Sequence, residues 1–138
     1  MASVRAKRFR FAASVDRDGR VLAENEAPIE LPERWLPEHL LLAAVACCTL
    51  KSLRFHARET AVSGAAQTSC VVTRREEDGL YAIVEVTIDF DVDLDPVPDA
   101  ESLGPLLAKA ERDCFVGNSL SVKPRYSWRV NGRPALPA

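Results

Sequence analysis

PEHLLLAAVACCTLKSLRFHARET, residues 37–60, is the stretch that decides the fold of this chain. Its opening proline and Glu38 are typical of a helix start, because proline suits the first helical position and the helix dipole favours negative charge there. From Leu40 to Leu50 a helix would be apolar around nearly its whole circumference, which predicts burial on most sides. Beyond Lys51 the pattern becomes amphipathic, and we expect Gly64 to close the segment.

Strand patterns precede this helix. Residues 7–24 predict a hairpin around the turn Arg17-Asp18-Gly19, because glycine accepts the positive φ that such turns require. A short third strand is expected near Ile29 and Leu31.

Two further strands are expected after the helix. Residues 66–77 predict the first, and Asp78-Gly79 predicts its hairpin turn. In the second, apolar residues alternate with acidic and polar ones, which predicts one buried face. These apolar residues are Val84, Val86, Ile88, Phe90, Val92 and Leu94.

A second helix is expected after Asp99, which can cap it. Spacings of three and four predict a buried stripe that ends at Cys114, and Gly117 is expected to break the helix. Residues 125–130 alternate again and predict a final strand. Three strands, a long helix, two strands, a helix and a strand together predict an α+β fold, with a long central helix packed on an antiparallel sheet.

Length and charge restrict the class of protein. A chain of 138 residues fits a single domain over residues 1–138. Its net charge of −2 gives no field that would recruit nucleic acid or an anionic membrane. No apolar run typical of a signal peptide follows the N-terminal basic residues, and Leu40 to Cys48 is shorter than the ~20 residues of a membrane span. We therefore expect a cytoplasmic protein.

The four cysteines lack the spacing of a zinc site. No two of them are separated by two residues, and His39 and His56 stand 17 positions apart (56 − 39). At ~100° per residue these histidines would point to different sides of a helix, so no metal is expected. In a reducing compartment a structural disulfide framework is not expected either.

Each cysteine alone has the properties of a small buried hydrophobe. Cys70 lies in a predicted strand and fits that interpretation. Cys47 and Cys48 are adjacent, so on a helix their side chains diverge by ~100° and cannot both face one site. Periodicity does not choose between them, and it cannot bring Cys114 close to either.

Two motifs carry a resemblance to a known family. PEHLLLAAVACC at residues 37–48 and AERDCFVGNSL at residues 110–120 resemble the osmotically inducible protein C / organic hydroperoxide resistance (OsmC/Ohr) family. Its members have a cysteine ten positions after the glutamate of a Pro-Glu helix start, and a second cysteine at the end of the next helix. Cys48 and Cys114 match these positions, and the resemblance covers about residues 15–131.

This resemblance implies a thiol peroxidase that reduces organic hydroperoxides, an antioxidant role in the stress response, and an intertwined homodimer. Cys48 would attack the peroxide and become a sulfenic acid, and Cys114 would condense with it to a disulfide. A lipoyl-type dithiol would then reduce the disulfide, and no cofactor is required.

An arginine before an Asp-Gly turn also matches the hydroperoxidases, and Arg17 has that place. We expect Arg17 to stabilise the Cys48 thiolate and Glu38 to orient Arg17. On a continuous helix Glu38 would lie ~15 Å along the axis from Cys48, which no glutamate spans. Either the helix is broken near its start, or the Glu38 that serves Cys48 belongs to another chain.

The chain also departs from the hydroperoxidase pattern. Phe115 stands where these enzymes often have proline, and Gly117 where they often have serine. These departures motivate an alternative function, a dimeric binding protein for a small apolar ligand whose cysteines are inert, because a fold does not fix an activity.

Overall fold

The computed structural model describes residues 6–138, and their contacts divide the chain into two compact units. The first ends at Leu36 and contains a small hairpin. The second, Pro37–Ala138, contains the helices and the main sheet.

The predicted N-terminal hairpin is confirmed, with shorter strands than residues 7–24 would allow. Strand β1 (Ala13–Val15) pairs antiparallel with β2 (Val21–Ala23). The Asp16 carboxylate closes the turn by accepting hydrogen bonds of 2.9 Å from the backbone N–H groups of Asp18 and Arg20. These bonds and the charge of Arg20 hold the pKa of Asp16 below its usual value.

The third strand expected in this unit is reduced to a single bridge. Ile29 pairs with Val21 through two backbone hydrogen bonds of 2.8 and 2.9 Å, and Leu31 lies outside any ladder. A bridge of one residue pair adds too few hydrogen bonds to fix the neighbouring residues as a strand.

The second unit begins with the long helix α1 (Pro37–Ala57), as predicted, but Gly64 does not end it. The helix ends before Arg58, which has a left-handed φ of 57°, and strand β3 (Ala61–Arg74) already contains Gly64. The physical reason is a close approach between strands. At φ 145°, a Cβ on Gly64 would lie 2.3 Å from the carbonyl oxygen of Asp91 on the neighbouring strand.

The main sheet has the order β3-β4-β5-β6. Strand β4 (Tyr81–Asp95) pairs antiparallel with β3 across the predicted Asp78-Gly79 turn. Strand β5 (Arg125–Val130) pairs parallel with β4, and β6 (Arg133–Ala135) pairs antiparallel with β5. The α+β class with a helix packed on a sheet is confirmed. The sheet is not wholly antiparallel as expected, because the chain crosses over through helices between β4 and β5, which makes that pair parallel.

Helix α2 (Ala100–Arg112) begins as predicted, with the Asp99 carboxylate accepting a 2.8 Å hydrogen bond from the Ser102 N–H. Its break does not occur at Gly117. The helix ends at Asp113, and Cys114 takes an extended conformation (φ −79°, ψ 103°) that starts the short helix α3 (Phe115–Asn118). Gly117 lies inside this helix and is buried.

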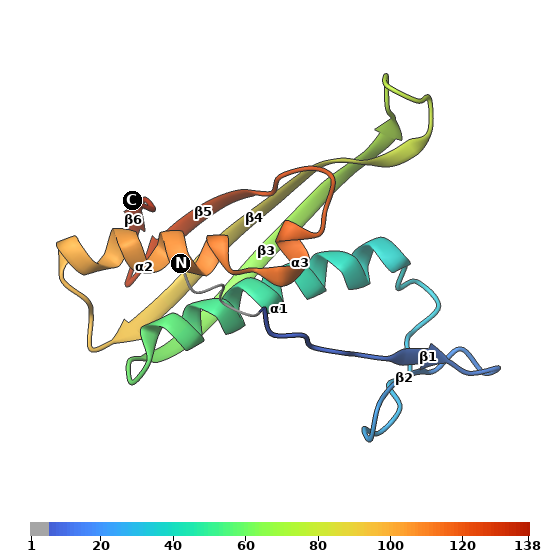
Figure 1. The fold of residues 1–138 in the computed structure, drawn as a ribbon, viewed down its shortest axis with the longest axis horizontal. Helices are drawn as coiled ribbons and strands as arrows, with labels where there is room; N and C mark the ends of the chain where they lie inside the picture. Colours follow the sequence, from blue (N-terminus) through green and yellow to red (C-terminus); the bar gives the residue numbers. More distant parts are fainter. Residues whose placement is uncertain (1–5) are drawn as a thin grey trace. The chain divides into compact units, whose positions relative to one another are not determined.

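The core forms where α1 and α2 pack against one face of the sheet (Figure 1). The apolar row of β4 points into it, as the alternation predicts, and Ile88 and Val92 are fully buried. From the helices, Val45, Leu53 and Leu107 complete the packing.

The prediction that α1 is buried on most sides is wrong for this chain, because its packing partners cover one side of the helix only. Val45, Ala46, Thr49, Ser52 and Leu53 face the core. The opposite side leaves other residues exposed, namely Leu40, Ala43, Ala44, Cys47 and Phe55. By length and composition α1 could also cross a membrane, but its fully buried Val45 and Leu53 are those of a core helix.

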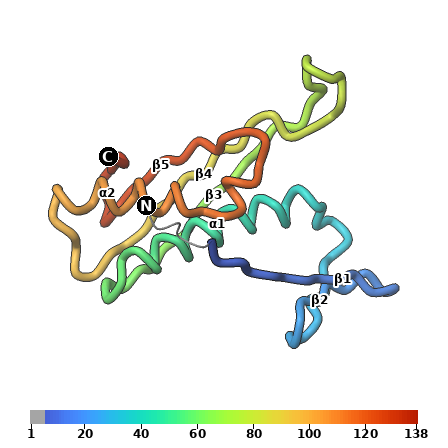
Figure 2. The backbone as a smooth tube through the Cα atoms, viewed as in Figure 1, coloured from blue at the N-terminus to red at the C-terminus, as the bar shows by residue number. Residues whose placement is uncertain are grey.

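The far end of the β3–β4 hairpin projects beyond the helices (Figure 2). Four apolar or aromatic side chains near this end are exposed, at Val71, Val72, Leu80 and Tyr81. Together with the outer side of α1, these residues form apolar surface of the second unit that lies outside its core.

Gly64→Ala tests the close approach between β3 and β4. We expect it to lower the free energy of unfolding by about 3 kcal/mol, since a methyl group at 2.3 Å from Asp91 O forces the strands apart. Gly79→Ala is the matched control. Gly79 also has a positive φ of 71° but nothing lies within 4 Å of its Cβ position, so about 1 kcal/mol is expected. Chemical denaturation measures both, and equal losses would contradict the contact.

Candidate thiol site

Helix α1 places Cys48 where α3 crosses it. The side chain is half-buried, and the backbone N–H of Val116 in α3 points at its sulfur at 3.5 Å. Cys47, the next residue, is exposed on another side of the helix, as the ~100° rotation per residue predicts. Of the two adjacent cysteines, Cys48 is therefore the one directed at the α2–α3 junction.

Cys114 occupies the junction itself and is fully buried. Its sulfur caps α3 by accepting a hydrogen bond from the Gly117 N–H at 3.3 Å. The hydroxyl of Thr49 lies 3.2 Å from the same sulfur, and the carbonyl oxygen of Val45 lies at 3.9 Å. Two residues of α1 thus contact Cys114 directly.

The two sulfurs that match the family motifs come together in this way. Thr49 follows Cys48 in α1, and Val116 and Gly117 follow Cys114, so each thiol is held by neighbours of the other. The two thiols are close enough for Cys114 to raise the pKa of Cys48. Cys70 lies in β3, partly buried, and all four cysteines are free.

Burial raises the pKa of the Cys48 thiol. The N–H groups of Val116 and Phe115 act in the opposite direction, while the neighbouring Cys114 raises the pKa further. The surroundings of Cys48 in the second unit therefore favour the neutral thiol. A reactive thiolate at this position needs a positive charge from elsewhere.

Tyr126 lies near both Cys114 and Glu111. Burial, with the nearby Cys114, raises the pKa of Tyr126 to about 12. Burial also raises the pKa of Glu111, which lies beside the indole of Trp128 and near Lys123. A hollow of about 610 Å³ is lined by Glu111, Lys123, Gly117 and Tyr126 among others.

Of the two charged residues expected at the site, one lies in α1 and the other in the first unit. Glu38 is exposed in the first turn of α1, and the helix runs unbroken to Cys48 and beyond. The first alternative, a helix broken near its start, is therefore wrong. Arg17 is exposed in the β1–β2 turn, in the other unit of the chain.

The two histidines lie near opposite ends of α1. His56, near the end of α1, pairs with Asp113 at 2.7 Å, and this contact helps to hold the α2–α3 junction against α1. Arg112 and His56 together lower the pKa of Asp113 to about 2. His39 is exposed in the first turn of α1, and in the part of the chain that the structure describes no three His, Cys, Asp or Glu side chains gather at one point.

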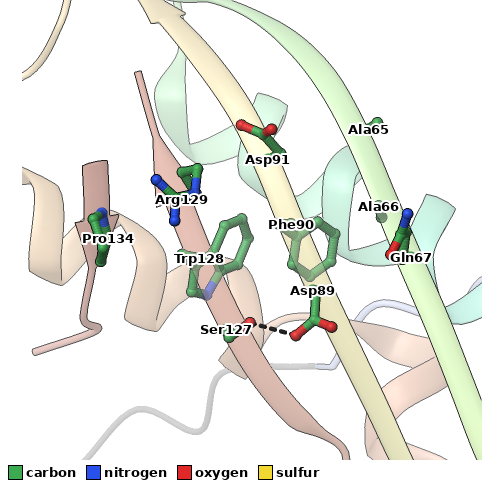
Figure 3. Close-up of a pocket in the computed structure, with 10 residues that line it drawn as sticks. All are labelled: Ala65, Ala66, Gln67, Asp89, Phe90, Asp91, Ser127, Trp128, Arg129 and Pro134. Atoms are coloured by element: carbon green, nitrogen blue, oxygen red, sulfur yellow. Dashed lines mark hydrogen bonds between the residues drawn. The ribbon is translucent and has the colours of Figure 1, made fainter. Parts of the chain in front are cut away.

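A second hollow, of about 470 Å³, lies along β3–β6 (Figure 3). The stacked rings of Phe90 and Trp128, with centroids 4.2 Å apart, line it, as do Asp89 and Ser127, which share a hydrogen bond. Neither Cys48 nor Cys114 is among its lining residues, so it offers no sulfur chemistry.

Three contributors to the site were missed from the sequence. In the sequence, Thr49 is one residue of a largely apolar predicted helix. Tyr126 is one residue of a predicted strand with an alternating pattern. Gly117 reads as a helix breaker, although its N–H serves Cys114. The sequence offered one signal for these contributors: Thr49 is a polar residue that directly follows the matched Cys48.

The structure thus shows an α+β protein in which two free thiols lie where helices meet on one face of a mixed sheet. Residues 32–128 match the family model described as OsmC-like protein. The chain belongs to the OsmC-like protein family, and the resemblance drawn from its two motifs is confirmed.

Solved structures share the fold. An OsmC-like protein from Mycoplasma pneumoniae is similar with a TM-score of 0.66 and 16% identity, over 90% of this chain and 97% of that chain. The organic hydroperoxide resistance protein OhrB of Bacillus subtilis gives a TM-score of 0.54 and 20% identity, over 87% and 96%. One from Elizabethkingia anophelis gives 0.56 and 16%, over 91% and 99%. No curated protein sequence matches the chain.

Proposed function

We propose that this protein is a thiol peroxidase that reduces organic hydroperoxides to alcohols, with Cys48 as nucleophile and Cys114 as resolving thiol. One observation carries the proposal: Cys48 and Cys114, far apart in the sequence, lie together at the α2–α3 junction, where each is contacted by neighbours of the other. The names of two similar structures, organic hydroperoxide resistance proteins, support it. We further propose that it works in the cytoplasm, where dithiols are kept reduced, without nucleic acid or membrane partners.

The proposed reaction has two halves. The Cys48 thiolate attacks the outer oxygen of ROOH, which keeps its proton, and the O–O bond breaks. The alkoxide leaves and takes a proton from water to become ROH, and Cys48 becomes a sulfenic acid. Cys114 then attacks the Cys48 sulfur, the S–O bond breaks, and hydroxide leaves as water with the proton that Cys114 gave up. A lipoyl-type dithiol reduces the resulting disulfide and is itself oxidised.

The exposures of the two thiols support this division of roles. Cys48 is half-buried on the flank of α1, whereas Cys114 is fully buried, so an incoming peroxide meets Cys48 first. The apolar residues of α1 around Cys48 favour an organic substrate over hydrogen peroxide.

The cysteine variants test the proposal. Cys48→Ser should abolish consumption of cumene hydroperoxide in the presence of dihydrolipoamide, because serine is nearly isosteric but has no reactive sulfur. Cys114→Ser should allow one turnover and then stall with Cys48 as a sulfenic acid, which a dimedone probe labels. Cys47→Ser is the matched control and should leave the consumption of cumene hydroperoxide nearly unchanged. An essential Cys47 would show that the motif is matched one residue too late.

The competing function, a dimeric binding protein for a small apolar ligand, is favoured by the raised pKa of Cys48. A binding protein needs no thiolate, so its thiols should react slowly with cumene hydroperoxide at neutral pH. Fast, stoichiometric loss of one thiol supports the peroxidase instead.

A positive charge must offset the burial of Cys48, and we propose that Arg17 supplies it. In Arg17→Ala the raised pKa of Cys48 would be unopposed, so the thiolate fraction at pH 7 should fall. We expect reaction with peroxide to slow at least about tenfold, which corresponds to one pKa unit or more. The deficit should shrink as the pH rises toward and above 9, because hydroxide then forms the thiolate without Arg17. A stopped-flow pH profile measures this, with Arg34→Ala as control, and equal profiles for Arg17→Ala and the wild type would exclude Arg17.

We also propose that residues 1–138 form a single OsmC-like domain whose site is completed by a second copy of the chain. The outer side of α1 supports this, because Leu40, Ala43, Ala44 and Cys47 recur at spacings of three and four and are all exposed. An apolar stripe of small residues suits close packing of a second helix. The exposed side chains of the first unit, such as Phe11 and Val15, need similar cover.

In such a homodimer, Glu38 of one chain would orient the arginine that serves Cys48 of the other. Co-expression of Glu38→Gln with Cys48→Ser tests this, because a mixed dimer would contain one complete site. About a quarter of wild-type activity is expected, since half of the dimers are mixed and each has one active site of two. Cys48→Ser with Cys114→Ser is the matched control. These thiols belong to one chain, so no activity should return. If neither pair recovers activity, Glu38 does not act across the dimer.

A further inference from the structure

Four groups surround the sulfur of Cys114, and one of them belongs to a strand. The Gly117 N–H at 3.3 Å, the Thr49 hydroxyl at 3.2 Å and the Val45 carbonyl at 3.9 Å come from the helices. The fourth is the phenol hydroxyl of Tyr126 in β5, which lies close enough to Cys114 and Thr49 for both to act on its pKa.

The absence of a side chain at Gly117 makes room for that hydroxyl. A Cβ at Gly117 would lie 2.7 Å from the Tyr126 hydroxyl oxygen and 3.2 Å from the Cys114 sulfur. The phenol and the sulfur therefore share one small space, which any other residue at position 117 would enter. Gly117 has an ordinary helical conformation, so the need for glycine here is one of space and not of backbone strain.

The Tyr126 hydroxyl keeps its proton at neutral pH. Burial, with Cys114 and Glu111 nearby, raises the pKa of Tyr126 to about 12, so at neutral pH the hydroxyl donates hydrogen bonds and does not act as a base. Thr49 has one proton, which it can give either to the Val45 carbonyl at 2.9 Å or to the Cys114 sulfur at 3.2 Å.

These donors suit a charged sulfur better than a neutral one. A thiol needs one acceptor, whereas a thiolate accepts several hydrogen bonds, and bonds to a charged partner are about twice as strong as neutral ones. Gly117 and Thr49 present donors to the Cys114 sulfur, which water does not reach, and the Tyr126 hydroxyl lies close enough to add a third.

We infer that Tyr126 is a catalytic residue that donates a hydrogen bond to the Cys114 sulfur when that sulfur carries negative charge, and that Gly117 admits it. This inference rests on the proposed peroxidase function. Charge arises on Cys114 twice. It appears when Cys114 attacks the Cys48 sulfenic acid, and again when a dithiol attacks the Cys48 sulfur of the disulfide, breaks the S–S bond and expels Cys114 as a thiolate. The expelled thiolate then takes a proton from the second thiol of the reductant, which attacks the mixed disulfide and releases Cys48.

Tyr126→Phe tests the inference in a Cys47→Ser/Cys70→Ser background. After mixing with cumene hydroperoxide, dimedone trapping measures the rise of the Cys48 sulfenic acid, and rapid alkylation with mass spectrometry measures the disulfide. We expect sulfenic acid formation at the wild-type rate and disulfide formation slowed at least about tenfold, because a hydrogen bond to a charged partner is lost. Tyr81→Phe, at the exposed tyrosine of β4, is the matched control and should change neither rate.

The split between the two rates separates a chemical role from a structural one. Equal slowing of both steps, or no slowing of the second, overturns the inference. If Tyr126→Phe does not fold, Gly117→Ala replaces it, because the added methyl group displaces the hydroxyl and should give the same split. A wild-type protein that forms no sulfenic acid refutes the peroxidase itself, whereas a working wild type with an unaffected Tyr126→Phe refutes only the role of Tyr126.

Discussion

The packing of α1 against the inner face of β4 is the constraint on which the rest of the second unit depends. Val45 and Leu53 are fully buried against that apolar row, and the rotation of α1 is thereby fixed. With this rotation Thr49 meets Cys114, and Cys48 meets the N–H of Val116. A rotation of one residue would direct Cys47 at the junction instead. The core packing therefore selects which of two adjacent cysteines belongs to the site.

Features encoded by local periodicity could be predicted from the sequence. The alternation of β4, the Asp99 cap of α2 and the Asp-Gly turns each depend on residues within a few positions of one another. The matched cysteines could be predicted as well, but only because two short motifs resemble a family. Nothing in the residues alone indicated that Cys48 and Cys114 would lie together, since their proximity depends on the crossing of α1 and α3.

Two glycines show why the remainder could not be predicted. Both were interpreted as ends of helices, which is the common local role of glycine. Gly64 is instead needed because the backbone of β4 approaches it, and Gly117 because a hydroxyl from β5 occupies the space beside it. The parallel pairing of β4 with β5 has the same origin, since it follows from the path of the chain through α2 and α3. Contacts between distant segments leave no pattern along the chain.

Two features of the second unit, the exposed apolar side of α1 and the raised pKa of Cys48, are physically linked. Its helix α1 leaves an apolar side exposed, although an apolar helix is stable only when covered. Its Cys48 thiol has a pKa raised by burial, and within this unit the partners that lower it are backbone N–H groups without a full charge. More apolar cover over Cys48 would raise the pKa further, so an active site requires that the covering surface also carry a cation. In the proposed homodimer, a second copy of the chain would bring both the apolar side of its own α1 and an Arg17, so dimerisation and thiolate formation would be one physical problem.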